Sequence, residues 1–223
     1  MKGKQGFNAS QPVYEYLKNL ILSGEMKPGD RIAEQKLADV LHISRTPIKE
    51  AINQLANDGL VRIYPQRYSE VMLFSEDDVR HMGEMRIALE MMSAKLALYH
   101  GSMADFNKLA KLADACEEAQ RSGDVFRQIE TDAEFHLSFT KCTKNPLLYK
   151  FQRELCLRIR LIQVNSTFSD EENQRLVEYH RQLVKYLKER NLASIYTLIE
   201  EHFFQFYKLD QEYPPNFFHL FRV

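Results

Sequence analysis

One carboxylate and three imidazoles in the second half of the chain are of the residue types that ligate metal ions. Asp132 and His136 are four residues apart and would project from the same face of a helix. His180 and His202 each lie among apolar residues at helical spacing in two later segments. If the three segments pack together, their nitrogen and oxygen atoms suit Zn²⁺, Ni²⁺, Mn²⁺ or Fe²⁺. The alternative is that each is a half-buried polar residue with its own hydrogen bond, and spacing alone leaves both interpretations open.

The elements that must position these residues are helices. From residue 75 onward the sequence shows helical periodicity and no strand pattern. Ser-Glu-Asp-Asp at 75–78 is of the capping-box type, and Asn-Pro at 145–146 is a second helix start. Short links between long helices imply antiparallel neighbours and therefore a bundle. The predicted helices cover about 75–99, 102–121, 124–142, 145–165, 169–190 and 191–209.

A different pattern precedes the bundle, in the run LADVLHISRTPIKEAINQLANDGL at 37–60. A short helix is followed by a tight turn at His42 and by a second helix that has Pro47 in its first turn, where the missing N–H costs nothing. Asp58-Gly59 ends that helix. The pattern predicts a helix-turn-helix, although two helices joined by a turn also occur in ordinary helical domains. The apolar stripe of the second helix consists of Ile48, Ile52, Leu55 and Ala56.

The start of this second helix carries residues suited to nucleic acid. A recognition helix contacts base edges in the major groove with its N-terminal residues, while hydroxyls and the helix N-terminus hold phosphate. Arg45 can pair with a guanine through two hydrogen bonds, and Lys49 can reach a base or a phosphate. The predicted DNA contacts are Gln35, Lys36, Ser44, Arg45, Thr46, Lys49 and Arg67.

The flanks of the motif favour a winged helix. A helix is predicted at 11–23, a turn-rich link at 24–30, and two short strands at 61–64 and 70–74. The predicted fold is therefore mainly α. It combines a winged helix-turn-helix DNA-binding domain at 1–74 with an all-α antiparallel bundle at 75–223.

Composition agrees with a globular regulator of this size. The 223 residues are 44% hydrophobic and 27% charged, and no apolar run is long enough to span a bilayer. The opening residues lack a secretory signal, so a cytoplasmic location without membrane contact is expected. Three cysteines without CxxC spacing indicate reduced core thiols. The net charge is −1, and residues 1–70 carry ten Lys and Arg against eight Asp and Glu, so DNA binding would depend on the local placement of cations.

The end of the chain, YPPNFFHLFRV at 213–223, is rich in aromatic residues. The favoured interpretation is a tail that packs on its own domain. The alternative is a contact with a second subunit, because an exposed aromatic surface of this size is unusual on a monomer.

The front of the chain resembles a known family. The run SGEMKPGDRIAEQKLADVLHISRTPIKEAINQLANDGLVRIYPQR is similar to the N-terminal domain of the GntR family of bacterial transcription regulators over about the first seventy residues. That family usually has Gly where His42 and Tyr68 stand, and Arg where Lys49 stands. Lys lacks the planar fork of Arg, which changes the expected base preference at that position. The resemblance implies a homodimer on a pseudo-palindromic operator in double-stranded DNA.

The rear of the chain resembles the FCD domain of the FadR subfamily, in the runs TDAEFHLSF, VEYHRQLVKYL and IEEHF. In that family an Asp and three His bind a metal at the floor of a cavity, and the effector is commonly a small carboxylate. The resemblance makes Asp132, His136, His180 and His202 the metal ligands. Arg86 and Glu90 match an R-x-x-x-E motif, and Asn145 matches the usual Asn after the third bundle helix. The predicted effector-binding residues are Arg86, Asn145 and Arg158.

Three functions remain to be compared. The first is a regulator that responds to a small carboxylate with the help of a divalent metal. In the second the metal itself is the signal. The third is a metalloenzyme, which the sequence favours least because it has no HExxH motif, no paired Glu-x-x-His motifs and no obvious general base.

Overall fold

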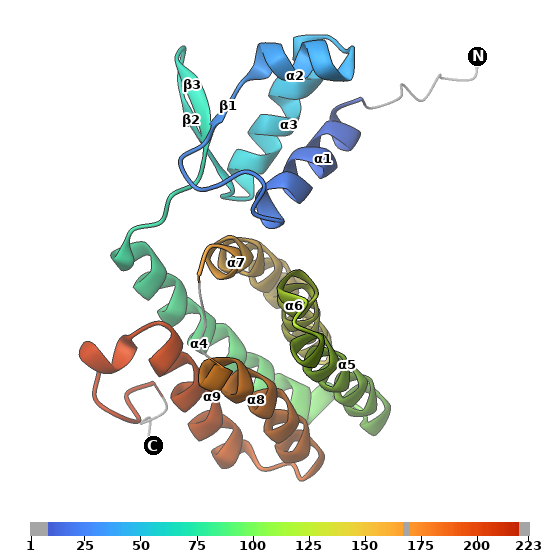
Figure 1. Cartoon of the computed structure of the whole chain (residues 1–223). Coiled ribbons are helices and arrows are strands. Elements are labelled where there is room, and N and C mark those ends of the chain that lie inside the picture. The colour runs from blue at the N-terminus through green and yellow to red at the C-terminus, as the bar shows by residue number, and fades with distance from the viewer. Residues whose placement is uncertain (1–8, 167–169, 219–223) are drawn as a thin grey trace, which may run out of the picture. The chain divides into compact units, whose positions relative to one another are not determined.

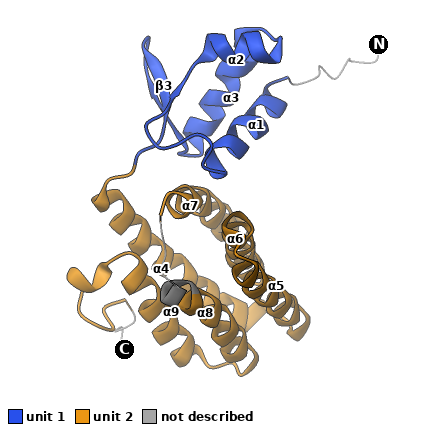
Figure 2. Cartoon of the chain, in the orientation of Figure 1, with its two compact units in different colours: residues 1–73 blue, residues 74–223 orange. Residues whose placement is uncertain are grey.

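The computed structural model describes residues 9–166 and 170–218 of the chain. It consists of two compact units, residues 1–73 and residues 74–223 (Figures 1 and 2). No helix in the described ranges is both long enough and apolar enough to cross a bilayer.

The first unit has three helices and a small sheet. The helices are α1 (Ser10–Leu22), α2 (Glu34–Leu41) and α3 (Arg45–Asn57). The strands are β1 (Arg31–Ile32), β2 (Val61–Tyr64) and β3 (Tyr68–Val71), paired antiparallel in the order β1-β3-β2. The predicted three helices and hairpin are confirmed, but the second hairpin strand begins and ends a few residues earlier than predicted. Strand β1 was not predicted.

The core of the first unit comes from the stripes that the sequence predicts. Leu17 and Ile21 of α1 are fully buried, as are Ile48 and Leu55 of α3. The Tyr14 hydroxyl donates to Asp58 Oδ2 at 2.6 Å, which joins α1 to the end of α3. This packing holds α3 against the rest of the unit along its apolar side and leaves its other side to solvent.

His42 ends α2 in an unusual backbone conformation. Its φ is 53° and its ψ 42°, in the left-handed region. Such a position is strained for any residue with a Cβ and is normally given to glycine. The turn between α2 and α3 therefore requires a left-handed backbone at position 42. This requirement explains the glycine that the GntR family usually has here.

The second unit is helical over its described residues. It contains α4 (Glu76–His100), α5 (Met103–Ser122), α6 (Val125–Lys141), α7 (Pro146–Val164), α8 (Asp170–Lys188) and α9 (Leu192–Phe206), followed by a short 3₁₀ turn, Leu209–Gln211. The six predicted helices are confirmed with small shifts at their ends. The predicted start of the fifth helix, Ser169, lies outside the described residues.

The helix starts follow from side chains that satisfy free backbone N–H groups. Ser75 and Asp78 form a complete capping box on α4, and Ser102 and Asp105 form another on α5. Asn191 caps α9 through a hydrogen bond from the Ser194 N–H. Ser75 also fixes where the unit begins, because the preceding Met72 N–H still bonds to the Leu60 carbonyl of the first unit's fold.

Helices α4 to α9 pack around a common apolar core (Figure 1). A close approach occurs at Gly83 of α4, where an added Cβ would lie 2.5 Å from Cγ of Tyr207. Glycine therefore lets the Tyr207 ring lie directly on the α4 backbone. The three cysteines are buried free thiols, as predicted, and burial raises the pKa of Cys116 to about 12.

The described part of the aromatic tail packs on its own unit. The Tyr213 hydroxyl donates to Glu84 Oε1 at 2.9 Å, and the Phe218 ring meets Phe204 edge to face. This agrees with the favoured interpretation of the tail. Residues 219–223, the rest of the predicted segment, lie outside the described residues.

Candidate metal centre and DNA-binding surface

Three of the four predicted metal ligands meet inside the second unit. Asp132 and His136 come from α6, one turn apart, and His180 comes from α8. One ligand atom from each lies within 4.8 Å of the other two, and all three residues are buried. Asp132 Oδ1 is 3.6 Å from His136 Nε2 and 3.3 Å from His180 Nε2. A carboxylate oxygen and two imidazole nitrogens that converge in this way form a donor set suited to a divalent metal.

The charges of the group fit that use. Burial opposes the ionisation of Asp132, but the adjacent His136 and His180 outweigh it and hold the pKa of the carboxyl well below its usual range. Burial lowers the pKa of His180, so its imidazole is neutral near pH 7. Metal ligands must be deprotonated, and an ionised Asp132 and a neutral His180 meet this requirement. Burial lowers the pKa of His136, but Glu90 and Asp132 outweigh it and raise the pKa, so His136 would release a proton when a metal binds.

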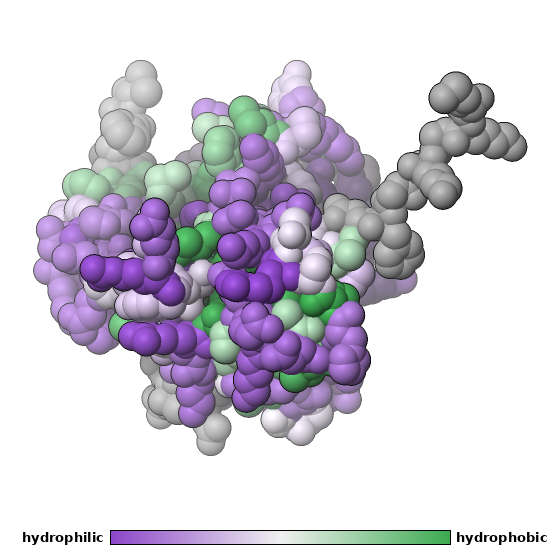
Figure 3. Space-filling model, turned by 90° about the horizontal axis from the view of Figure 1, so that it is seen from above, coloured by the Kyte–Doolittle hydropathy of each residue, from purple (hydrophilic) through white to green (hydrophobic). Residues whose placement is uncertain are grey.

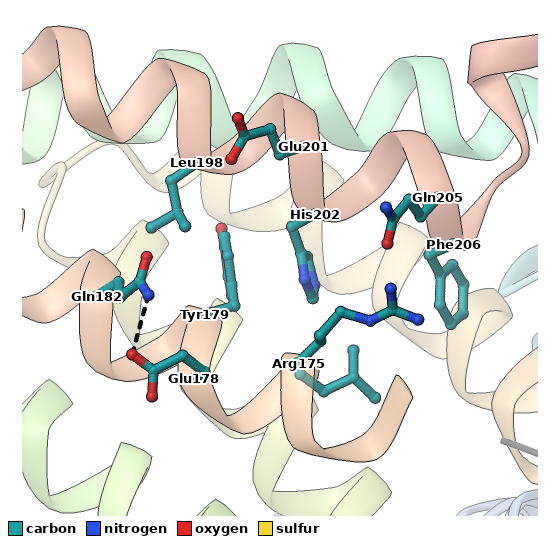
Figure 4. A pocket seen from close by; sticks show the side chains of 10 residues that line it. Arg175, Glu178, Tyr179, Gln182, Leu198, Glu201, His202, Gln205 and Phe206 are labelled. Carbon is teal, nitrogen blue, oxygen red and sulfur yellow. Dashed lines mark hydrogen bonds between the residues drawn. The ribbon is translucent and has the colours of Figure 1, made fainter. Parts of the chain in front are cut away.

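His202, the predicted fourth ligand, does not join the other three. Its ring stacks on Tyr179, with centroids 3.9 Å apart and planes at 13°. Figure 4 shows the two rings side by side, Tyr179 from α8 and His202 from α9. Both line a pocket of ≈ 450 Å³ whose wall also includes Arg175, Glu201 and Gln205. Asp132, His136 and His180 thus converge, whereas His202 is outside this group and its ring is held against Tyr179.

Three further polar side chains surround the group from α4 and α7. Gln163 Nε2 donates to Asp132 Oδ2 at 3.2 Å. Glu90 Oε1 lies 2.8 Å from His136 Nδ1, and the same oxygen accepts from Gln152 Nε2 at 2.7 Å. Sequence reasoning singled out Glu90 only as part of a motif and missed both glutamines. A usable signal was present, because Gln152 and Gln163 interrupt the apolar face of α7 on which Leu155 and Ile159 are buried.

A small pocket reaches two of the ligands. Its volume is ≈ 230 Å³, and Asp132 and His180 form part of its wall together with Gln128, Gln163 and Ser166. The remaining wall is mainly apolar. A pocket that combines apolar walls with a few convergent polar groups is typical of a small-molecule site.

The predicted DNA contacts lie on the exposed side of the first unit. Ser44, Arg45, Thr46 and Lys49 are all exposed around the first turn of α3. Ser44 occupies the N-cap position, but its hydroxyl makes no capping hydrogen bond. Arg45 Nη2 lies 3.0 Å from Glu34 Oε2, and the arginine side chain stays 55% exposed. Hydrophilic residues dominate the face seen from the side of α2 (Figure 3).

The remaining predicted contacts flank α3. Gln35 and Lys36 are exposed on α2, and Gln35 Nε2 donates to Asp39 Oδ1 at 2.9 Å. Arg67 is exposed in the turn between β2 and β3. These residues and those of α3 put donors for phosphate and bases on the exposed surface of one small unit.

In the wing, Tyr68 stands where the GntR family usually has Gly, and its side chain packs on the sheet. Tyr68 is not an exposed tip: its ring is 4.7 Å from that of Tyr64, and the Arg31 guanidinium lies 4.0 Å above it. The turn residue in the left-handed region is Gln66, with a φ of 59°. The aromatic side chain at position 68 therefore packs on the sheet and leaves the turn to Gln66 and Arg67.

Comparison with protein families accounts for both units. The model for bacterial regulatory proteins of the gntR family matches residues 9–71, and the FCD domain model matches residues 81–205. The second match covers more than half of the chain. The chain belongs to the GntR family and carries an FCD domain. This confirms the resemblance to the FadR subfamily that the sequence motifs indicated.

Relatives of this GntR-family protein support the same assignment along most of its length. It is 25% identical over 191 residues to the HTH-type transcriptional regulator YdhC of Bacillus subtilis, covering 85% of each chain. It is 28% identical over 193 residues to the Nta operon transcriptional regulator of Aminobacter aminovorans, covering 83% of this chain and 89% of the relative. These relatives are named as transcriptional regulators. The two matched domains make this protein a transcriptional regulator of the GntR/FCD type.

A solved structure shares the fold of this GntR-family protein. E. coli McbR/YncC matches with a TM-score of 0.75 at 23% identity, over 92% of this chain and 99% of that one. At this level of identity the match concerns the fold alone.

The residues predicted to bind an effector lie apart from one another. Arg86 is 3% exposed on α4, where its guanidinium lies 4.9 Å from the Phe203 ring centroid and its Nε is 3.9 Å from Glu90 Oε1. Asn145 is exposed, and its Oδ1 accepts hydrogen bonds from the N–H groups of Leu147 and Leu148. Asn145 therefore caps the start of α7. Arg158 is half-buried on α7. The pocket at Asp132 and His180 includes none of these three residues.

Proposed function

We propose that this regulator binds a pseudo-palindromic DNA operator as a homodimer, and that a small carboxylate effector changes that binding with the help of a divalent metal. The observation that carries the proposal is that the buried side chains of Asp132, His136 and His180 converge beside a small pocket. Since its partner would be chromosomal DNA, we infer a cytoplasmic location.

The donor set supports Zn²⁺, Ni²⁺, Mn²⁺ or Fe²⁺ as the metal. Asp132, His136 and His180 would hold it, and His202 is the fourth candidate through its family motif. A bound divalent ion would supply positive charge and open coordination positions for a carboxylate oxygen. The pocket of ≈ 230 Å³ limits the effector to a small organic or sugar acid.

On the DNA side, α3 would enter the major groove with Arg45 and Lys49 toward base edges and Ser44 and Thr46 toward phosphate. Effector and operator must then change each other's affinity by the same factor, because the two binding equilibria are linked.

A surface on α4 supports pairing with a second copy. Met85, Met92 and Tyr99 are 55%, 50% and 83% exposed, and they are spaced seven residues apart, so they form one stripe. Apolar side chains at this spacing are typical of helix–helix contacts between subunits. We expect Met92→Glu to shift the sedimentation coefficient toward a monomer and Lys111→Glu, on the exposed side of α5, to leave it unchanged. A monomeric wild type would contradict this part of the proposal.

The test of the effector site combines metal analysis with operator binding. Elemental analysis of the purified protein should find one divalent metal per chain, lost in Asp132→Ala and retained in Asp114→Ala, an exposed aspartate of α5. Fluorescence anisotropy with operator DNA should then respond to a panel of small hydroxy and sugar acids only when metal is bound. A response to metal alone would identify the ion as the signal, which is the second candidate function.

A further inference from the structure

We propose that Glu90 is a positioning residue that fixes the ring orientation and tautomer of His136, so that Nε2 of this imidazole is the metal-binding atom. The inference rests on the proposed metal site. It assigns a role to a carboxylate that is outside the group of three ligands.

The two nitrogens of His136 face different partners. Nδ1 lies 2.8 Å from Glu90 Oε1. Nε2 lies on the other side of the ring, 3.6 Å from Asp132 Oδ1 and 3.4 Å from His180 Nε2. The ring therefore bridges the carboxylate of Glu90 and the point at which the ligand atoms converge.

This arrangement selects one tautomer. An ionised carboxylate only accepts hydrogen bonds, and a neutral imidazole carries a single N–H. Glu90 Oε1 lies 2.8 Å from Nδ1 as an ion-pair contact outside hydrogen-bond geometry. In a neutral ring this carboxylate favours the proton on Nδ1 and the lone pair on Nε2, which faces the ligand group. A carboxylate behind a ligating histidine also raises the basicity of the nitrogen that binds the metal.

Glu90 is itself held in place. It is 0% exposed, and Gln152 Nε2 donates to the same Oε1 at 2.7 Å. Arg86 Nε lies 3.9 Å from that oxygen, also in the buried interior. A buried carboxylate is costly unless it is paired and hydrogen-bonded. The partners on α4 and α7 offset this cost and fix the position of Oε1 relative to α6.

The first measurement needs no metal. Burial lowers the pKa of His136, but Glu90 and Asp132 outweigh it and raise the pKa, so the spectra are recorded at alkaline pH, where the ring is neutral. Side-chain ¹⁵N chemical shifts of the metal-free, full-length protein should then show His136 with its proton on Nδ1. Glu90→Leu removes the acceptor, and we expect the Nε2–H form to appear. A wild-type His136 protonated on Nε2 would overturn the proposal, whether or not the protein binds metal.

The second measurement is Zn²⁺ affinity, by competition with a chromophoric chelator. Glu90→Leu should weaken Zn²⁺ binding about 10- to 100-fold, the usual effect of losing such a partner. Glu90→Gln keeps an oxygen acceptor and should lose less. Glu200→Leu removes another buried carboxylate, on α9, and serves as the matched control. An unchanged Zn²⁺ affinity in a folded Glu90→Leu protein would refute the positioning role and leave the metal site standing.

Thermal unfolding of each metal-free variant separates positioning from folding. If Glu90→Leu does not fold, the tautomer of His136 in the wild type decides the question: a proton on Nδ1 of the neutral ring supports the proposal, and a proton on Nε2 overturns it. A wild type that binds no Zn²⁺, Ni²⁺ or Mn²⁺ would instead contradict the proposed function, and the tautomer measurement would still decide the role of Glu90.

Discussion

The two units differ in whether they bury charged side chains. Among the described residues of the first unit, the buried polar side chains are Ser10 and Ser69, and neither carries a charge. The second unit buries Arg86, Glu90, Asp132, His136 and Glu200 among others. The converging metal-ligand candidates Asp132, His136 and His180 are thus inside, whereas the predicted DNA contacts of the first unit are exposed around α3.

This difference follows from what each unit has to contact. A surface that binds DNA works with solvated cations, which cost little to keep and are neutralised by phosphate. A site that binds an ion within a protein needs donors removed from water, and each removed charge requires a partner. The charges that a unit buries therefore indicate where its ligand binds.

The largest expected effect is on operator binding, from a change at the exposed start of α3. Arg45→Ala should weaken specific operator binding by about 1–3 kcal/mol, because a guanidinium that pairs with guanine is lost. Lys27→Ala, an exposed cation of the loop before β1, is the control and should have a smaller effect. Fluorescence anisotropy at fixed salt measures both, and Zn²⁺ affinity should not change in either. A DNase footprint unaltered by Arg45→Ala would remove α3 from the role of recognition helix.

In the second unit, the largest expected effect on stability comes from the close approach between Gly83 and Tyr207. An added methyl would meet the Tyr207 ring at 2.5 Å, and overpacking of this kind costs about 1–3 kcal/mol. We therefore expect Gly83→Ala to lower the free energy of unfolding in urea, although alanine is the better helix former by about 1 kcal/mol. In a Tyr207→Ala background the contact with the ring is gone, but Tyr207 Cβ would still lie 2.6 Å from the added methyl, so the same change should cost less stability than in the wild type. Equal effects in both backgrounds would argue against this contact.

A gain in stability is expected in the first unit. His42 has a φ of 53°, which glycine adopts without the cost of roughly 1 kcal/mol that a Cβ adds. His42→Gly should therefore raise the melting temperature of the first unit. The same exchange at His81, an exposed position within α4, should lower stability by about 1 kcal/mol because the backbone there is helical. Effects of the same sign at both positions would contradict the explanation.

The smallest effect concerns a surface cap of the second unit. The Ser102 backbone N–H and hydroxyl, with help from Lys144, lower the pKa of Asp105 to about 2 from its usual 3.8. Because the folded pKa is the lower one, the stabilisation is complete above pH 4 and is lost as the pH falls through 2. Asp105→Ala should cost about 1 kcal/mol at pH 7, allowing for solvent screening. Urea unfolding between pH 2 and 5 should show the difference from wild type shrinking toward pH 2, and a constant difference would exclude the carboxylate as its source.

The fold was largely predictable because its signals are local. The capping residues Ser75, Ser102 and Asn145 begin helices where the sequence indicated. Strand β1 has two residues and depends on pairing with β3, so no periodicity could reveal it.

Helical spacing alone predicted the neighbouring positions of Asp132 and His136, and the family resemblance added His180 from α8. Asp132 and His136 are brought together by the helical repeat alone, whereas His202 depends on the competing contact with Tyr179 from another helix. Asn145 matched a family position, yet its side chain forms a cap. A motif match identifies a residue, but the neighbours in space decide which partner it contacts.

One consequence concerns the junction at residue 74. Only Leu73 and Phe74 separate Met72, whose N–H bonds to Leu60, from Ser75, which caps α4. Two extended residues reach about 7 Å, so the paired tethers of a dimer add about 14 Å, or roughly four base pairs of separation. If the regulator binds its operator as the proposed dimer, we therefore expect operators whose half-sites are moved apart by about five base pairs or more not to be bound, so that the length of this junction would limit which promoters it can control.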